Sequence, residues 1–326
     1  MLGSVHDADD AVQETLIRAW RGASGLRAEA AARSWLYRIA TNVCLTEIER
    51  RRRRGLPHDF GPASAGSIQP GTPLTESTWL EPYPDSALDG GTISPEARYE
   101  QRESVELAFV AAVQLLGANQ RAVLMLRDVL GFSAQETADL LDTSVASANS
   151  ALQRARTTVA EKLPARSQQA TLRALGEKTV QTLIDRWVDA WERNDVSAFA
   201  ALLAQDATFA MPPLATWYRG HNDVVEWARR YSLNGMWRWR ALISRANGQP
   251  ALAFYCWDDT DAAYLPFAMN VLTLDDEGLV ADVTAFIVRT PDAEDPEDYR
   301  RFPDQPLHER LGAMYARFGL PGRLDD

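Results

Sequence analysis

Residues 133–156 read SAQETADLLDTSVASANSALQRAR, and this stretch decides the fold of the first half of the chain. Ser133 followed by Glu136 forms a capping box that begins one helix, and Ser144 can cap a second one. Between the two lies a short polar break, Asp142-Thr143-Ser144. A helix, a tight break and a second helix are the form in which a recognition helix enters the DNA major groove. The pattern predicts a helix-turn-helix, and an ordinary helical hairpin is the alternative.

The second helix of this motif has an apolar side and a polar side. Its apolar residues recur at helical spacing and predict the buried side: Val145, Ala148, Leu152 and Ala155. The remaining side chains can hydrogen-bond to base edges or phosphates. We predict that the following residues bind DNA: Ser144, Ser147, Asn149, Ser150, Gln153, Arg154 and Arg156.

Upstream of the motif, residues 9–21 and 33–54 have apolar positions at helical spacing and predict two helices. The polar side of the first helix is available to a partner and carries Asp9, Asp10, Gln13, Glu14 and Arg18. The second helix opens with Trp35, continues through Asn42 and ends in a run of five arginines, Arg50, Arg51, Arg52, Arg53 and Arg54. Such a run can neutralise phosphates, and an aromatic with an amide can receive an unstacked base. The alternatives are core packing for Trp35 and a solvated helix end for the arginines.

Residues 56–95 are rich in proline and glycine and lack periodicity, so they predict a linker. One aromatic island, WLEPYP at residues 79–84, interrupts it and is expected to pack on another part of the chain. Helices resume over 96–116, 119–129, 133–141 and 145–162. A second boundary falls near residues 164–169.

Beyond that boundary the pattern changes to helices followed by strands. Helices are predicted over 177–194, 196–204 and 221–231, and strands over 206–211, 237–247, 250–258, 264–274 and 279–289. This order is typical of an α+β domain whose helices pack on one antiparallel sheet. Its aromatic side chains could line a concave pocket or simply fill the core. The candidate pocket residues are Trp217, Tyr218, His221, Trp237, Trp239, Tyr255, Trp257 and Phe267.

Composition narrows the classes of function. The net charge of -11 argues against a strongly basic nucleic-acid binder, but the arginine run concentrates positive charge locally. No phosphate-binding loop, metal-ligand cluster or nucleophile motif is visible, so we expect no cofactor, no metal and no enzymatic activity. Asp206 and His221 could serve as an acid or base, yet each has a simpler role beside a turn or helix start. The sequence has no apolar run long enough for a membrane span, no signal peptide and two distant cysteines, which favours the cytoplasm.

The motif and its upstream helices resemble one family. LGANQRAVLMLRDVLGFSAQETADLLDTSVASANSALQRAR, at 116–156, is similar to region four of the extracytoplasmic-function sigma factors. HDADDAVQETLIRAWRG, at 6–22, resembles the region-two helix that grips RNA polymerase, and 33–53 resembles the helix that melts promoter DNA. The resemblance implies core RNA polymerase and promoter DNA as partners. It departs at Gly117-Ala118, where the family has leucine-proline, and at Asn149, where a lysine is frequent. The family also has a region-two helix before residue 6, so the resemblance implies a shortened N-terminus.

Residues 177–290 resemble the SnoaL-like branch of the nuclear-transport-factor-two superfamily, which implies a cone-shaped α+β barrel with a mouth for a small-molecule ligand. WLEPYPD resembles a linker motif of sigma factors whose appended domain regulates them. The expected organisation is region two at 1–55, a linker at 56–95, region four at 96–165, a SnoaL-like domain at 170–295 and a tail at 296–326. We expect a sigma factor regulated by its own C-terminal domain. The alternatives are a polyketide-cyclase-like enzyme with a DNA-binding appendage, and a repressor that works without polymerase.

Overall fold

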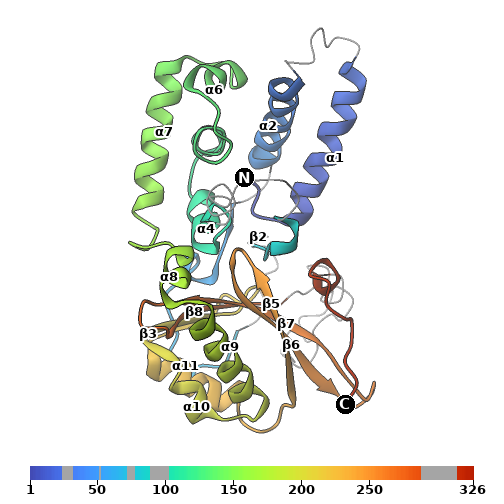
Figure 1. Cartoon of the computed structure of the whole chain (residues 1–326), viewed down its shortest axis with the longest axis vertical. Helices are drawn as coiled ribbons and strands as arrows, with labels where there is room; N and C mark the ends of the chain where they lie inside the picture. Colours follow the sequence, from blue (N-terminus) through green and yellow to red (C-terminus); the bar gives the residue numbers. More distant parts are fainter. Residues whose placement is uncertain (24–31, 51–52, 72–77, 89–102, 288–313) are drawn as a thin grey trace. The chain divides into compact units, whose positions relative to one another are not determined.

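The computed structural model describes residues 1–23, 32–50, 53–71, 78–88, 103–287 and 314–326. The chain forms two compact units (Figure 1). The first, here called the helical unit, comprises Met1–Gly55 and Ile93–Ala165. The second, the C-terminal unit, comprises Leu56–Thr92 and Arg166–Asp326. The proline-rich segment after residue 55 is therefore grouped with the C-terminal residues, from which it is far away in sequence.

The helical unit begins with α1 (Val5–Gly22) and α2 (Ala32–Arg50), which lie side by side in Figure 1 and lead to the short β1 (Arg54–Gly55). α1 starts four residues earlier than the sequence pattern predicts, because Ser4 caps it: its Oγ accepts a hydrogen bond from the Asp7 N–H at 3.1 Å. The buried side of α1 is made of small residues, Ala11, Thr15 and Ala19.

The rest of the helical unit is α4 (Leu107–Gln114), α5 (Ala118–Leu124), a π-helical turn at Met125–Val129, α6 (Ala134–Leu140) and α7 (Val145–Ala160). Val113 and Leu116 pack with Leu152 and Val159 of α7 to form its core. The helix predicted over 96–116 lies partly outside the described residues, and its described part begins at Leu107. None of the described helices combines the length and the apolar character needed to cross a membrane.

Arg121 fixes the junction between α4 and α5. Its guanidinium is buried and donates to the Gln114 side chain at 2.8 Å, and to the backbone carbonyls of Gln114 at 2.9 Å and Leu116 at 3.2 Å. Burial lowers the pKa of Arg121 to about 10, which still leaves it charged at neutral pH. An arginine here therefore satisfies the carbonyls left open at the end of α4.

The C-terminal unit contains a six-stranded sheet with helices packed on it. Its helices are α8 (Gln168–Leu175), α9 (Glu177–Glu192), α10 (Val196–Ala200) and α11 (His221–Trp227), the last continued by a π-helical turn at Ala228–Ser232. The strands are β3 (Leu203–Ala210), β4 (Trp217–Arg219), β5 (Trp239–Ala246), β6 (Gln249–Asp258), β7 (Ala263–Leu274) and β8 (Val280–Phe286). The earlier segment adds a 3-10 turn at Pro57–Asp59, β2 (Thr78–Trp79) and a second 3-10 turn at Asp85–Ala87.

The strand order is β4-β3-β8-β7-β6-β5, and the sheet is mixed. β3 and β8 run parallel, whereas every other neighbouring pair in this sheet is antiparallel. The expectation of a purely antiparallel sheet is therefore wrong at this one pairing. The reason is that β8 enters between β7 and β3, and strand order cannot be read from apolar alternation along each strand.

An aromatic cluster fills the space between the helices and the sheet. Trp187 and Trp191 of α9 pack against Phe199 of α10, with ring centroids 5.0 and 5.8 Å away. Trp191 also contacts Phe254 of β6 at 4.8 Å. Large rings at the centre of a small domain supply most of its buried apolar area, so this cluster holds the helices on the sheet.

Candidate nucleic-acid interface and C-terminal cavity

The helix-turn-helix begins with the predicted capping box. The Ser133 hydroxyl accepts from the Glu136 N–H at 3.2 Å, and the Glu136 carboxylate accepts from the Ser133 N–H at 2.8 Å. The turn reverses at Asp142, whose φ of 50° is in the left-handed region. Ser144 then caps α7 by accepting from the Ser147 N–H at 3.1 Å. Local hydrogen bonds thus set both ends of the turn.

α7 presents a polar, exposed face. Each residue that the sequence predicts to bind DNA on this helix is exposed: Ser144, Ser147, Asn149, Ser150, Gln153, Arg154 and Arg156. Ala148, Leu152 and Ala155 of the predicted inward side are buried, whereas Val145 is only half-buried. Arg156 forms a bidentate ion pair with Asp128: its Nε and Nη2 donate to the two carboxylate oxygens at 2.9 and 2.7 Å. Arg154 is therefore better placed than Arg156 to reach a nucleic acid.

α2 is held against the helix-turn-helix by side chains from its first turns. The Tyr37 ring meets Phe132 edge-on at 5.1 Å, and the Arg33 guanidinium lies 4.8 Å from the Phe132 centroid and donates to the Leu130 carbonyl. Trp35 is half-buried, and its ring lies so close to Gly22 that a Cβ there would be 3.1 Å from it. Asn42 is exposed, one turn before Thr46, which donates to its carbonyl.

The arginine run does not act as one surface. Arg50 is 72% exposed and lies 3.8 Å from Glu47. Arg51 and Arg52 lie outside the described residues, and Arg53 is exposed. Arg54 instead turns inward, and its guanidinium contacts the buried Asp7 carboxylate at 2.5 Å. The expectation that Arg54 contacts phosphate therefore does not fit this structure, because an acidic group of α1 occupies its guanidinium.

α1 combines a polar face with an exposed apolar stripe. Asp9, Asp10 and Gln13 are exposed, and Glu14 pairs with Arg18 at 2.6 Å. Helical spacing of this kind is also typical of a buried side, but the side chains of the stripe are largely exposed: Val12 57%, Leu16 59%, Ile17 45% and Trp20 85%. A contiguous group of large apolar side chains on a surface marks a contact site. Spacing alone could not reveal it, because a buried and a docking face share the same period.

Residues 61–71 of the proline-rich segment lie on the C-terminal unit near β4 and α11. The Ser64 N–H donates to the Trp217 carbonyl at 2.8 Å, and the Gly66 N–H donates to the Asp223 carboxylate at 2.8 Å. Tyr218 and Tyr231 donate their hydroxyls to the carbonyls of Ile68 and Ser67 at 2.8 and 2.9 Å. This segment, here called the first linker strap, is thus held by side chains and backbone of the domain.

A second contact, the second linker strap at residues 83–85, joins the turn between β5 and β6. Tyr83 and Asn247 exchange two hydrogen bonds of 2.9 and 2.8 Å. The buried Asp85 carboxylate accepts from the Gly248 N–H at 2.7 Å and contacts Arg245 at 3.2 Å. The aromatic island was predicted to pack on another part of the chain, and its Tyr83, together with Asp85 directly after it, contacts the turn between β5 and β6.

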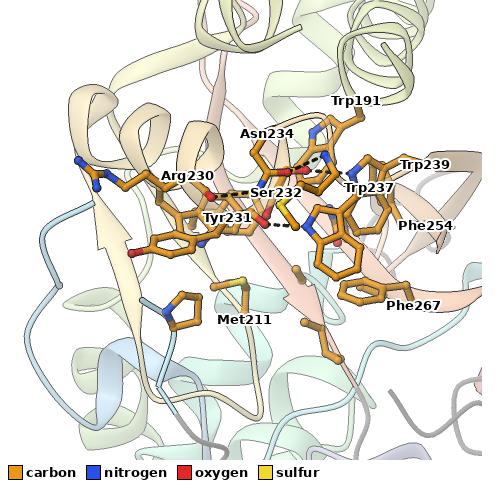
Figure 2. Close-up of a pocket in the computed structure, with 18 of the residues that line it drawn as sticks. Trp191, Met211, Arg230, Tyr231, Ser232, Asn234, Trp237, Trp239, Phe254 and Phe267 are labelled. Atoms are coloured by element: carbon orange, nitrogen blue, oxygen red, sulfur yellow. Dashed lines mark hydrogen bonds between the residues drawn. The ribbon is translucent and has the colours of Figure 1, made fainter. Parts of the chain in front are cut away.

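A cavity of about 240 Å³ opens in the C-terminal unit (Figure 2). Its wall combines Trp191 and Phe254 of the aromatic cluster with the π-helical turn after α11 and with Gln69 and Pro70 of the first linker strap. In Figure 2 the indoles of Trp237 and Trp239 lie on one side of it, and Trp237 donates its N–H to Tyr231. Concave, mainly apolar sites with few polar groups are where small molecules bind.

The predicted pocket residues divide into three groups. Trp237, Trp239 and Phe267 line the cavity. Trp217 and Tyr218 hold the first linker strap instead, because the Trp217 indole donates to Gly61 at 2.9 Å and the Tyr218 hydroxyl to Ile68. Burial raises the pKa of Tyr218, so that hydroxyl stays a donor. The sequence pattern could not separate these groups, because every one is an aromatic at a strand or turn.

The remaining three predicted pocket residues also lie elsewhere. His221 contacts the Ala200 carbonyl at 2.9 Å. Tyr255 donates to the Pro321 carbonyl at 2.8 Å, and the Trp257 ring packs under the Arg238 guanidinium at 4.2 Å. The cavity wall includes polar residues that the sequence analysis missed, above all Asn270 of β7. The sequence did contain a signal for Asn270, because an asparagine is unusual inside an otherwise apolar strand.

The end of the chain also packs on the sheet. Tyr315 is fully buried, with its hydroxyl 2.7 Å from the carbonyl oxygens of both Phe254 and Ala268. Leu324 exchanges two backbone hydrogen bonds with Tyr264, of 2.8 and 2.9 Å. These contacts tie residues 314–326 to β6 and β7.

Asp282 of β8 gives a testable pH dependence. The half-buried carboxylate accepts hydrogen bonds from Thr208 and Thr284. Desolvation raises the pKa of Asp282, and this effect is larger than the lowering caused by the two hydrogen bonds and by His58. In the unfolded chain Asp282 has the ordinary pKa of 3.8, and in the folded chain its pKa is higher. The free energy of unfolding therefore falls as the pH rises from 3.8 to the pKa of the folded state, because over this range the folded chain binds the proton more tightly than the unfolded chain does. We expect Asp282→Asn to raise the Tm more at pH 7 than at pH 4. A gain independent of pH, measured by calorimetry, would contradict this.

Comparison with known proteins identifies these parts. Residues 1–54 match Sigma-70 region 2, residues 106–159 match Sigma-70 region 4, and residues 184–289 match the SnoaL-like domain. The fold therefore defines a helix-turn-helix protein with an appended SnoaL-like domain. The chain is 41% identical to the ECF RNA polymerase sigma factor SigG of Mycobacterium tuberculosis, over 99% of this chain and 80% of that protein. The chain belongs to the extracytoplasmic-function RNA polymerase sigma factors.

One further relative and one solved structure are also similar to this chain. The ECF RNA polymerase sigma-E factor of Escherichia coli is 27% identical over 48% of this chain and 74% of that protein. The crystal structure of Mycobacterium tuberculosis SigJ, an extracytoplasmic function sigma factor, superposes with a TM-score of 0.54 at 21% identity. It covers 87% of this chain and 88% of that one, so the two share the multidomain fold.

Proposed function

We propose that this protein directs core RNA polymerase to specific promoters, initiates transcription there, and is regulated by its own C-terminal unit. The observation that carries the proposal is the exposed polar face of α7, in a chain whose two sigma regions are both present. In this assignment α7 reads the upstream promoter element, with Arg154 and Gln153 best placed to reach bases. The role in initiation places the protein in the cytoplasm.

The helices of region two supply the polymerase contact and promoter opening. Asp9, Asp10, Gln13, Glu14 and Arg18 of α1 form the polar part of the polymerase-binding surface, and the exposed apolar stripe next to them adds buried area. Interfaces gain much of their affinity from such apolar residues at the centre of a polar rim. α2 contributes Trp35, Asn42 and the exposed arginines toward the separated DNA strands.

The C-terminal unit acts by holding the linker rather than by catalysis. The two linker straps bind to it through three hydrogen bonds that involve a carboxylate, one of them also an ion pair, and through two neutral hydrogen bonds from tyrosine hydroxyls. This holding sets how far the linker can extend between the two sigma regions. The candidate catalytic groups lie away from the cavity wall: Asp206 is exposed on β3, and His221 contacts a backbone carbonyl.

Run-off transcription with core polymerase tests the proposal. We expect the full chain to bind core in a pull-down and to support transcription from a promoter selected from random DNA. Binding of that DNA without binding of core would instead indicate a repressor. Turnover of a small molecule by the isolated full chain would favour the enzyme alternative.

Arg154→Ala is expected to weaken specific promoter binding by about 1–3 kcal/mol, because a lost base contact has that magnitude. The measurement is competition between the selected promoter and a scrambled duplex at fixed salt. Arg193→Ala is the matched control, since it also removes an exposed arginine but one that follows directly after α9 in the C-terminal unit. Equal specificity ratios for the two variants would exclude base reading by Arg154.

A further inference from the structure

Three buried polar atoms around the cavity have no hydrogen-bond partner among the described residues. They are Oδ1 of Asn270 and the indole Nε1 atoms of Trp191 and Trp227. The residues are 2%, 4% and 2% exposed, and all three line the cavity. Buried polar groups in folded proteins are nearly always paired, so three unpaired groups around one cavity require an explanation.

Neighbouring indoles of the same wall are satisfied. Trp237 donates its N–H to the Tyr231 carbonyl at 3.0 Å, and Trp239 donates to the Ser232 carbonyl at 3.0 Å. Both acceptors belong to the π-helical turn after α11. The turn therefore provides carbonyls for two tryptophans, while Trp191 and Trp227 keep unused donors. One acceptor and two donors thus remain around a single apolar space.

The wall also limits the charge and size of a ligand. Its large side chains are mostly aromatic or aliphatic, and among the described wall residues Arg230 is the one charged group. Arg230 is neutralised by Glu226 at 2.5 Å. At the packing density of about 0.75 of protein interiors, 240 Å³ holds roughly 180 Å³ of ligand, or on the order of ten to twelve non-hydrogen atoms.

We propose that this cavity binds an uncharged bicyclic aromatic alcohol. A single hydroxyl can both donate to Asn270 Oδ1 and accept from an indole N–H, which are the two kinds of group left unpaired. The flat ring system packs against the aromatic wall, including Phe254 and Phe267. A charged ligand is disfavoured, because the wall offers no unpaired charge to offset its desolvation.

Ligand binding is coupled to the linker. Gln69 and Pro70 of the first linker strap form part of the cavity wall, so a ligand contacts them only when the strap is in place. Binding and strap docking must then strengthen each other by the same factor. The consequence for transcription rests on the proposed function, whereas ligand binding itself does not.

Calorimetric titration of the full chain with 2-naphthol tests the site. We expect saturable one-to-one binding, and at least tenfold weaker binding of 2-methoxynaphthalene, which cannot donate a hydrogen bond. Asn270→Leu and Trp227→Phe should each weaken 2-naphthol about tenfold. Without ligand, Asn270→Leu should raise the Tm, since it removes an unpaired polar atom; a structural role for the amide would lower it.

Trp187→Phe is the matched control. Its indole N–H is also buried and unpartnered among the described residues, but Trp187 does not line the cavity. This variant should bind 2-naphthol as the parent chain does. Absence of binding, or equal affinity for Asn270→Leu, Trp227→Phe and the parent, would overturn the site.

A variant that releases the strap tests the coupling. Gly66→Ala should weaken 2-naphthol severalfold, and unchanged affinity would overturn the coupling. Loss of run-off transcription by the parent chain would overturn the proposed function while leaving 2-naphthol binding intact, so the two failures are distinguishable.

Discussion

Gly66→Ala is expected to release the first linker strap from the C-terminal unit. A Cβ at Gly66 would lie 2.1 Å from the Asp223 carbonyl oxygen and 2.8 Å from its carbonyl carbon. Both are backbone atoms of α11, so neither can swing aside as a side chain could. The strap itself must move, which breaks the Gly66 bond to Asp223 and strains the bonds on either side of it.

Hydrogen–deuterium exchange of the full chain measures this release. We expect the amides of Ser64 and Gly71, which are bonded to Trp217 and Thr216, to exchange at least tenfold faster in Gly66→Ala. Gly61→Ala is the matched control, because a Cβ there meets nothing within 4 Å. Equal protection in both variants would mean that the strap tolerates a side chain at residue 66.

The same pair of variants tests regulation. If the docked strap restrains the linker, Gly66→Ala changes the amount of run-off transcript from the selected promoter and Gly61→Ala does not. An unchanged transcript level in a variant that has lost protection at Ser64 and Gly71 would show that strap docking does not control initiation.

The helix-turn-helix was readable from sequence because its determinants are local. Ser133, Glu136 and Ser144 cap the helices by hydrogen bonds within three residues, as their spacing indicates. The α+β class was equally readable, because it depends only on the order of apolar periods. Both features require no knowledge of which distant segments meet.

The contact partners of individual side chains could not be predicted from the sequence. Tyr218 and Trp239 are both aromatics of edge strands, yet one holds a linker carbonyl and the other lines the cavity. Val12 and Leu16 have the spacing of a buried stripe but are exposed. The difference lies in which chain segments come together, and tertiary contacts of that range leave no trace in local periodicity.

Arg54 shows the same limit within one motif. As part of an arginine run it suggests phosphate binding, but its side chain is only 13% exposed and pairs with Asp7, which is 6% exposed. The pair joins the first turn of α1 to the end of the region-two segment. Removing one partner of an ion pair in such surroundings is more costly than removing one partner of a pair on the surface.

Asp7→Ala is therefore expected to destabilise the helical unit by about 3 kcal/mol, because it removes the Asp7 carboxylate from a guanidinium that is only 13% exposed. Opening free energies of α1 and α2 amides, from hydrogen exchange of the full chain, measure the loss. Glu14→Ala is the control: it breaks an exposed pair with Arg18, for which about 0.5 kcal/mol is expected. Similar losses for the two would show that the Asp7 pair is no stronger than a surface one.

Alanine substitutions of Arg54 and Arg50 should then have different effects on stability. Arg54→Ala should destabilise the helical unit as Asp7→Ala does, whereas Arg50→Ala, at a side chain 72% exposed, should leave the opening free energies unchanged. If Arg50 contacts a DNA phosphate, Arg50→Ala makes the slope of log K for promoter binding against log salt concentration shallower by about 1. A stable Arg54→Ala variant that shows only this reduced salt dependence would reverse the assignment and place Arg54 on the DNA surface.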